Sequence, residues 1–321
     1  MALFKVVWRL LSGISKVISI LIPLTIFGAF LFVISQGLSE SSSDPLPEKA
    51  ALLIAPTGPL LEDLAPIEPI FTLLNQDFDR PTLLSDVVKV IQQAAEDDRI
   101  NSLVLKLDQL VGPSITQALE IIDAVKIFKA SGKTVIATGD FYSQAHYLLA
   151  AQADHVLLHP EGGIFLQGFA VYRSYIRSFL EKIRVKMHVF RVGTNKSAVE
   201  PYLRDSMSDA EKAVVGRWLG NLWSKYTELV ETGRALPAGA IDKLIAEFPE
   251  RLKALRGDVP ELLLQEGLVD ELVDHQQMKG RLIELIGLTD HRGEIQTVDV
   301  NRYLEAAIVS EESTLAEQPL I

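Results

Sequence analysis

The sequence predicts an α/β fold built from parallel βαβ units and preceded by one N-terminal transmembrane helix. Two observations predict it. From about residue 50 to residue 200, short apolar runs alternate with segments of helical apolar spacing, which is the pattern of a parallel sheet with crossover helices. Before them, residues 17–34 carry no charged side chain, and a run of that length can cross the roughly 30 Å hydrocarbon layer of a bilayer.

The first residues indicate how this helix is oriented. Lys5, Arg9 and Lys16 precede the apolar run, and no acidic residue occurs before Glu40. The positive-inside rule therefore places residues 1–16 in the cytoplasm and the rest of the chain outside it. We assign 17–35 to an uncleaved membrane anchor and the Ser/Pro-rich stretch 36–49 to a linker. A cleavable signal peptide is the alternative, but its apolar region is usually shorter and ends at a small-x-small site.

The remaining elements follow from apolar periodicity. Strands are expected over 50–55, 100–107, 133–138, 155–159 and 187–192, with an extended stretch at 165–171. Helices are expected over 82–97, 115–129, 142–152, 172–183 and 208–231. The last helix begins with Ser208-Asp209-Ala210-Glu211, which matches a capping box. Helices dominate as far as 286, so we assign the domain to 50–288 and the acidic stretch 289–321 to a linker and the start of a further domain.

Composition excludes several classes of function. The chain of 321 residues has a formal net charge of −11, which argues against a general nucleic-acid binder. It has no cysteine, so it has no cysteine nucleophile and no cysteine-ligated metal. The stretch GTNKS (193–197) lacks the glycines of a phosphate-binding loop. His155 and His159 lie four apart in an expected strand, about 13 Å along it, too far to share a metal. We expect no cofactor and no metal.

Two polar residues remain as candidates for chemistry. Ser143 lies at a strand-to-helix turn, where it suits a nucleophile but more simply a helix N-cap. Lys196 follows the expected strand 187–192 and Gly193, beside Ser197. A lysine acts as a base only after losing its proton, and burial away from water favours that loss. From spacing alone, an exposed loop lysine is the simpler interpretation.

A longer stretch of sequence adds a family resemblance. Residues 190–208 (FRVGTNKSAVEPYLRDSMS) closely resemble the lysine segment of the signal peptide peptidase A family, also called protease IV, in its long, two-domain form. The basic start with its anchor, 85–100, 139–162 and 217–226 resemble the same family. The resemblance covers essentially the whole chain, which is similar to the N-terminal half of that form.

The resemblance implies a fold, an activity and a set of partners. The fold would be a ClpP/crotonase-like spiral of βαβ units, with residues 50–288 as the N-terminal peptidase domain. Members of the family are serine endopeptidases that degrade cleaved signal peptides with a Ser–Lys dyad. They assemble as homotetramers, single-pass, on the periplasmic side of the bacterial cytoplasmic membrane. The implied partners are signal peptides and other extended apolar peptides, and membrane lipid through residues 17–35. Lys196 matches the family's general base.

The chain departs from the family at the nucleophile. The family's serine lies in a C-terminal domain, in an Ala-Ser-Gly-Gly segment that this sequence lacks. The corresponding slot falls on Ser143 or Gln144, and the loop LDQLVGPS (107–114) has one glycine where a Pro-Gly-Gly oxyanion loop is expected. We therefore expect the base-bearing half of an enzyme, whether as a fragment, a frameshifted product or a split-gene subunit. The alternative is an inactive membrane-tethered scaffold or peptide-binding homologue. An acyl-CoA enzyme would rest on fold analogy alone.

Overall fold

The computed structural model describes residues 22–25, 27–28, 46–63, 82–193, 196–289 and 292–307. Internal contacts divide the chain into two units, Met1–Pro45 and Leu46–Ile321. The predicted transmembrane segment 17–35 lies outside the described residues except at 22–25 and 27–28, which are helical. Within the described residues, no helix combines the length and the apolar character needed to cross a bilayer.

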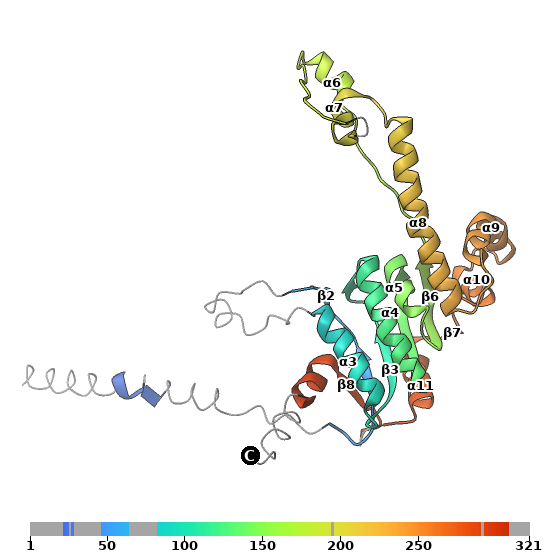
Figure 1. Cartoon of the computed structure of the whole chain (residues 1–321). Helices are drawn as coiled ribbons and strands as arrows, with labels where there is room; N and C mark the ends of the chain where they lie inside the picture. Colours follow the sequence, from blue (N-terminus) through green and yellow to red (C-terminus); the bar gives the residue numbers. More distant parts are fainter. Residues whose placement is uncertain are drawn as a thin grey trace, which may run out of the picture. The chain divides into compact units, whose positions relative to one another are not determined.

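The second unit is built on a six-stranded sheet whose paired strands are all parallel (Figure 1). In spatial order the strands are β7 (Glu271–Leu272), β6 (His155–Phe165), β5 (Thr134–Ser143), β3 (Ile100–Lys106), β1 (Ala50–Ile54) and β8 (Thr297–Asp299). The four inner strands of this order were expected from short apolar runs, so the α/β prediction with a parallel sheet is confirmed. The edge strands β7 and β8 are too short to show any alternation.

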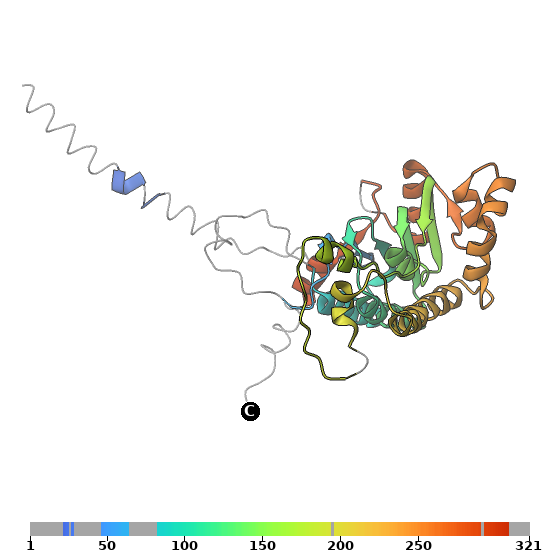
Figure 2. The ribbon, with the colours of Figure 1, turned by 90° about the horizontal axis from the view of Figure 1, so that it is seen from above.

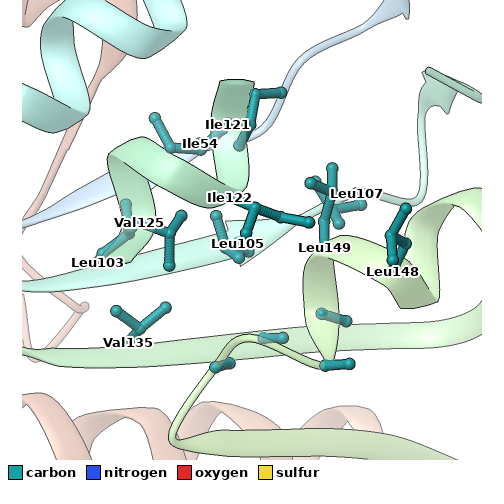
Figure 3. Close-up of a cluster of buried hydrophobic side chains, with 14 of the residues drawn as sticks. Ile54, Leu103, Leu105, Leu107, Ile121, Ile122, Val125, Val135, Leu148 and Leu149 are labelled. Carbon is teal, nitrogen blue, oxygen red and sulfur yellow. The ribbon is translucent and has the colours of Figure 1, made fainter. Parts of the chain in front are cut away.

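One face of the sheet carries the main hydrophobic core. It is covered by α3 (Leu84–Glu96), α4 (Ile115–Ala130) and α5 (Gln144–Ala150). Figure 3 shows the centre of this core, where side chains of α4 and α5 gather over those of the strands. Its most buried members include Ile122, Val125, Leu103, Leu105 and Val135. Burying each such side chain contributes about 1.5–3 kcal/mol, so this layer holds most of the stability.

The opposite face carries a smaller core under α11 (His275–Ile286). Residues alternate between the two faces of a strand, so Val104 points away from its neighbours Leu103 and Leu105 and packs in this second core. Six apolar side chains around the second core are only partly buried: Leu53, Met278, Leu282, Leu285, Leu288 and Ile295. A single helix therefore leaves this face incompletely covered.

Strands β5 and β6 run further than predicted. The expected ends were residues 138 and 159, whereas pairing continues to Ser143 and Phe165 after a register shift between Gly139 and Phe141. The two backbones approach closely at the shift, because a Cβ at Gly162 would lie 1.9 Å from the carbonyl oxygen of Asp140. The extension takes the first two residues of the predicted helix 142–152, so α5 begins at Gln144.

The long helix α8 (Asp209–Gly233) confirms the helix expected over 208–231. Its predicted capping box forms only in part. The Ser208 hydroxyl accepts the Glu211 N–H at 3.1 Å, but other bonds replace the reciprocal one between the Ser208 N–H and the Glu211 carboxylate. The Ser208 N–H donates to Glu200 at 3.0 Å, and the Glu211 carboxylate pairs with Arg173 at 3.2 Å. Partners from distant parts of the chain therefore override the local motif.

Two further helices, α9 (Ala240–Ala254) and α10 (Val259–Gln265), pack beside the C-terminal end of α8 (Figures 1 and 2). The buried Glu231 of α8 holds the start of α9, since its carboxylate accepts the N–H groups of Gly239 and Ile241, each at 3.0 Å. The first N–H groups of a helix have no intrahelical partner, so this carboxylate satisfies them. The helical character expected from 208 to 286 is confirmed.

Two predicted elements between β6 and α8 are corrected. Of the helix expected over 172–183, only α6 (Arg177–Lys182) forms, and the strand expected over 187–192 does not form. Phe190 and Val192 in this segment are 97% and 86% exposed. A strand needs a neighbour for its N–H and C=O groups, and within the described chain none pairs with residues 187–192. The pattern of residues 187–192 is typical of a strand, but a sequence pattern does not show whether a partner strand is present.

Asp97, just after α3, connects three parts of the unit. Its carboxylate accepts hydrogen bonds from the Arg99 guanidinium at 2.8 and 2.9 Å and from the Tyr303 hydroxyl at 2.9 Å. These donors, Arg99 first, lower the pKa of Asp97 from 3.8 to about 2. The carboxylate thereby ties the helical residues 300–307 to the end of α3.

Replacing this carboxylate should destabilise the fold in a pH-dependent way. We expect Asp97→Asn to lower the free energy of unfolding by about 1.5–3 kcal/mol near neutral pH, since hydrogen bonds to a charged group are lost. The folded pKa lies below the ordinary value, so the stabilisation is complete above pH 3.8 and is lost as the pH falls through about 2. Urea unfolding of both proteins at several pH values measures the difference.

The matched control is Asp123→Asn on α4, whose carboxylate is 71% exposed and pairs with Lys126. Exposed pairs of this kind contribute about 0–1 kcal/mol, so little change is expected. A loss at Asp97 no larger than this control, or one that does not shrink in acid, would contradict the role given to Asp97.

Two glycines of α8 should respond in opposite ways to alanine. A Cβ at Gly233 would lie 2.4 Å from the carbonyl oxygen of Ala151, whereas one at Gly220 meets nothing within 4 Å. We expect Gly233→Ala to destabilise by about 1–3 kcal/mol through overpacking, and Gly220→Ala to stabilise by about 0.5–1 kcal/mol through helix propensity. Thermal unfolding monitored by circular dichroism tests both, and equal signs would refute the packing of α8 on α5.

Candidate active site

Lys196 lies on an exposed segment between α6 and α8. It is the N-cap residue of the short 3-10 helix η1 (Ser197–Val199), and it follows Gly193, whose φ of +102° favours glycine. Its backbone carbonyl accepts a hydrogen bond from the Arg191 guanidinium at 3.0 Å. Within the described residues no partner is recorded for its amine, and the side chain is exposed. The lysine therefore points into solvent from a loop whose backbone is held.

The segment that carries Lys196 is fastened to the start of α8. Glu200, the first residue of α7 (Glu200–Leu203), accepts hydrogen bonds from the Ser208 hydroxyl at 2.6 Å and from the Ser208 N–H at 3.0 Å. These donors, the hydroxyl first, lower the pKa of Glu200 below its ordinary value. The carboxylate thus bridges α7 to the N-cap of α8. No spacing in the sequence marks Glu200 for this role.

A second set of bonds joins α6 to α7. The Ile176 N–H donates to the Pro201 carbonyl at 2.8 Å, and the Ser178 N–H donates to the Asp205 carboxylate at 2.9 Å. Asp205 also pairs with Arg177, and its donors, the Ser178 N–H first, lower its pKa. Residues 172–193 and 196–208 therefore form one connected projection, which we call the arm. Figure 1 shows α6 and α7 of the arm beyond the N-terminal half of α8, away from the sheet.

The arm is apolar as well as exposed. Its large exposed apolar side chains are Tyr172, Phe179, Ile183, Val185, Met187, Phe190, Val192, Tyr202 and Leu203. None of the residues of α6 or α7 is buried. Contiguous exposed apolar surface of this kind marks a site of protein–protein or membrane contact. Hydrogen bonds and ion pairs therefore connect the segments of the arm, whereas its large apolar side chains stay exposed to solvent.

Ser143 is the N-cap of α5. Its hydroxyl accepts the backbone N–H of His146 at 3.2 Å. The imidazole of His146 turns elsewhere, with Nε2 2.7 Å from the Leu110 carbonyl. The N-cap role expected for Ser143 is confirmed, and among the described residues no hydrogen bond joins Ser143 to Lys196.

Gln144, the other residue of the slot, fastens a turn. Its side-chain oxygen accepts the N–H groups of Gln167 and Gly168 at 3.0 and 2.8 Å, and its amide nitrogen donates to the Gly168 carbonyl at 3.3 Å. The amide thereby holds the turn after β6 against the start of α5. A carboxamide is a poor nucleophile in any case, and its structural role across 24 residues of sequence was not evident from the sequence alone.

The loop 107–114 is also committed to structure. Its residues Leu110–Val111 form strand β4, which pairs with β2 (Gly58–Pro59). Its end caps α4 through a complete capping box between Ser114 and Gln117. The loop that replaces the family's Pro-Gly-Gly segment therefore serves as a connection between the sheet and α4.

Of the two histidines set aside as metal ligands, His155 is the first residue of β6 and His159 lies near its middle. His159 Nδ1 accepts the Glu161 N–H at 3.2 Å, and its ring lies 4.9 Å from that of His275. No group of three or more metal-binding side chains occurs among the residues that the structure describes. These histidines therefore belong to local contacts at the rim of the sheet.

Comparison with known proteins identifies relatives of the whole chain. Residues 127–289 match Peptidase family S49. Protease 4 of Salmonella typhi is 32% identical over 294 residues, which make up 88% of this chain and 47% of that protein. Protease 4 of Haemophilus influenzae is 33% identical over 304 residues, 94% of this chain and 49% of that protein. The chain spans about half the length of these curated relatives.

Solved structures resemble the chain more distantly. A mutant of the membrane-bound stomatin-specific protease 1510-N overlaps 79% of this chain and 98% of its own, with a TM-score of 0.41 and 11% sequence identity. The ClpP/crotonase-like spiral stays a prediction at this level of similarity. The resemblance to protease IV is confirmed by sequence, and the chain belongs to peptidase family S49.

Proposed function

We propose that this chain is the base-bearing part of a membrane-anchored serine endopeptidase that degrades cleaved signal peptides and other extended apolar peptides. Lys196 is the general base of a Ser–Lys dyad. The observation that carries this assignment is the resemblance of residues 190–208 to the lysine segment of the family. Within the described residues the amine of Lys196 is unengaged, and its carbonyl accepts a hydrogen bond from Arg191. Membership of a peptidase family supports the reaction class.

The chemistry assigned to the lysine is a proton transfer in two directions. A serine hydroxyl is a weak nucleophile, so an uncharged amine takes its proton as the oxygen attacks the peptide carbonyl. The same amine then gives that proton to the departing peptide nitrogen, leaving an acyl-enzyme. Water, deprotonated by the lysine, releases the acyl group in the second half of the reaction.

An exposed lysine cannot perform this step well, because water stabilises its charged form. Lys196 is exposed in this chain, and so are Phe190 and Val192 just before it. A further domain or subunit must therefore cover the arm and exclude water from the amine. The exposed apolar side chains supply the surface for that contact, which supports assembly as a homo-oligomer.

The nucleophilic serine is assigned to that further domain or subunit. Ser143 caps α5 and Gln144 fastens the turn after β6, so we assign neither as the nucleophile. Residues 17–35 provide the membrane anchor of the proposal, and the positive-inside rule puts the domain on the periplasmic side. The Salmonella and Haemophilus relatives are bacterial, so the membrane of the proposal is the bacterial cytoplasmic membrane. An apolar substrate left in a membrane fits that location.

Removing the amine should abolish peptide cleavage without unfolding the protein. In the natural assembly extracted from membranes, we expect Lys196→Ala to reduce kcat for an apolar peptide by at least about 10²–10⁴-fold, the usual contribution of a general base. The matched control is Lys186→Ala, an exposed lysine of the same arm, which should cleave normally. Retained cleavage in Lys196→Ala, with assembly intact by size-exclusion chromatography, would refute the assignment.

A serine-reactive fluorophosphonate separates this proposal from its alternative. The engaged Gln144 favours the second candidate, an inactive membrane-tethered scaffold or peptide-binding homologue. We expect the natural assembly to be labelled, and to lose most labelling in Lys196→Ala because the serine is no longer activated. An assembly that is neither labelled nor able to cleave peptides would assign the chain to the scaffold class.

Ser143→Ala should affect stability and leave catalysis intact. The substitution removes the cap of α5, which costs about 0.5–2 kcal/mol, while the rate of peptide cleavage stays within about twofold of the original, since Ser143 contacts no reacting group in this proposal. Cleavage kinetics together with thermal unfolding measure the two effects. A loss of cleavage comparable with that of Lys196→Ala would place the nucleophile in this domain after all.

A further inference from the structure

A cavity of about 380 Å³ opens between α11 and the carboxyl ends of β1, β3 and β5. Its volume lies within the range of about 300–1,000 Å³ that is typical of small-molecule sites. In parallel α/β sheets, ligands bind at the carboxyl ends of the strands. Neither Lys196 nor Ser143 lines this cavity, so it is separate from the proposed peptidase site.

The cavity wall formed by the sheet is apolar at its inner end and charged at its outer end. Leu53 pairs with Val104 in the innermost row, and Lys106 pairs with Thr138 in the next. Asp108 and Asp140 follow, joined by a hydrogen bond of 3.2 Å from the Asp140 N–H to the Asp108 carboxylate. Residues two apart on a strand share a face and lie about 7 Å apart. The cavity therefore passes from an apolar row to a cation and then to two carboxylates.

The wall formed by α11 follows the same order. Ile286, Leu282 and Met278 line it at helical spacing and are apolar. His275, at the first turn of α11, reaches the outermost row, with its Nε2 3.6 Å from the Asp140 carboxylate. Two independent elements thus present apolar groups at depth and polar groups at the mouth.

Some of the charged side chains at the cavity have partners within the protein, and one does not among the described residues. Lys279 pairs with Glu294, and the acids of the outer row contact the Asp140 N–H and His275. Lys106 is exposed, and no ion pair or hydrogen bond is recorded for its amine within the described residues. An anionic group of a ligand therefore has one free cation to bind, with the carboxylates one row further out.

We propose that this cavity binds a small zwitterion with an apolar side chain, namely an apolar amino acid or the dipeptide made from it. Its carboxylate pairs with Lys106, its ammonium group faces Asp108 and Asp140, and its side chain enters the apolar end between Val104 and Leu282. A fatty acid would bring no cation to the carboxylates, and an alkylamine would leave Lys106 unpaired. The site requires no hydrolysis, so it stands apart from the Ser–Lys dyad.

Isothermal titration calorimetry on the purified full chain tests the proposal with four probes: Leu-Leu, L-leucine, 4-methylpentanoate and 3-methylbutylamine. We expect saturable binding of Leu-Leu or L-leucine, with both singly charged analogues at least about tenfold weaker. Whichever zwitterion binds more tightly identifies the source as a peptide end or a free amino acid. Equal binding of 4-methylpentanoate would overturn the assignment, as would no binding of either zwitterion.

Variants place the ligand in the cavity. Lys106→Met and Asp140→Asn should each weaken binding at least about tenfold, and both side chains are exposed, so folding is expected to be preserved. The control is Lys89→Met, an exposed lysine of α3 on the opposite layer, which should bind as the original does. Unchanged binding in Lys106→Met and Asp140→Asn, with folding confirmed by circular dichroism, would refute the site.

Discussion

The constraint on which this structure depends is that a parallel sheet has two apolar faces and both must be kept from water. Alternation along β3 sends Leu103 and Leu105 to one face and Val104 to the other. Helices α3, α4 and α5 cover the first face, which holds the larger core. The second face is covered by α11, and Leu53, Met278, Leu282 and Ile295 on this face stay partly exposed to solvent. The cavity beside α11 is a direct result of that unequal cover.

The arm follows a different principle, because polar bonds rather than a core hold it together. Glu200, Asp205 and Glu211 each accept hydrogen bonds or ion pairs from a neighbouring segment of the arm or of α8. Such contacts join the described segments on either side of Lys196, whereas none of the residues of α6 or α7 is buried. The arm is thus shaped before any partner covers it, and a preshaped surface loses less entropy on binding than a disordered one.

Periodicity was sufficient for the parts of the fold that rest on local burial. The helix over 82–97 and the strand over 100–107 formed as α3 and β3 within a residue or two, since the apolar spacing in each matches the face that is buried. Periodicity gave the wrong prediction where the structure of a segment depends on a residue far away in the sequence. The strand expected at 187–192 found no neighbour, and Glu211 left its capping box for Arg173. The role of Gln144 was hidden for the same reason, because Gly168 lies 24 residues away.

The two uncovered regions call for partners of different sizes. Along the arm, Tyr172, Phe190 and Val192 stand out from the backbone with no wall facing them, so only a surface as large as a protein can remove them from water. Beside α11, apolar side chains already line two facing walls, and the charges pass from Lys106, whose amine has no partner among the described residues, to two carboxylates. A cavity whose charges have a fixed order suits a small molecule with matching charges. An open apolar surface suits any partner with a large enough apolar surface of its own. The arrangement of apolar surface, more than its amount, therefore separates a subunit contact from a ligand site in this chain.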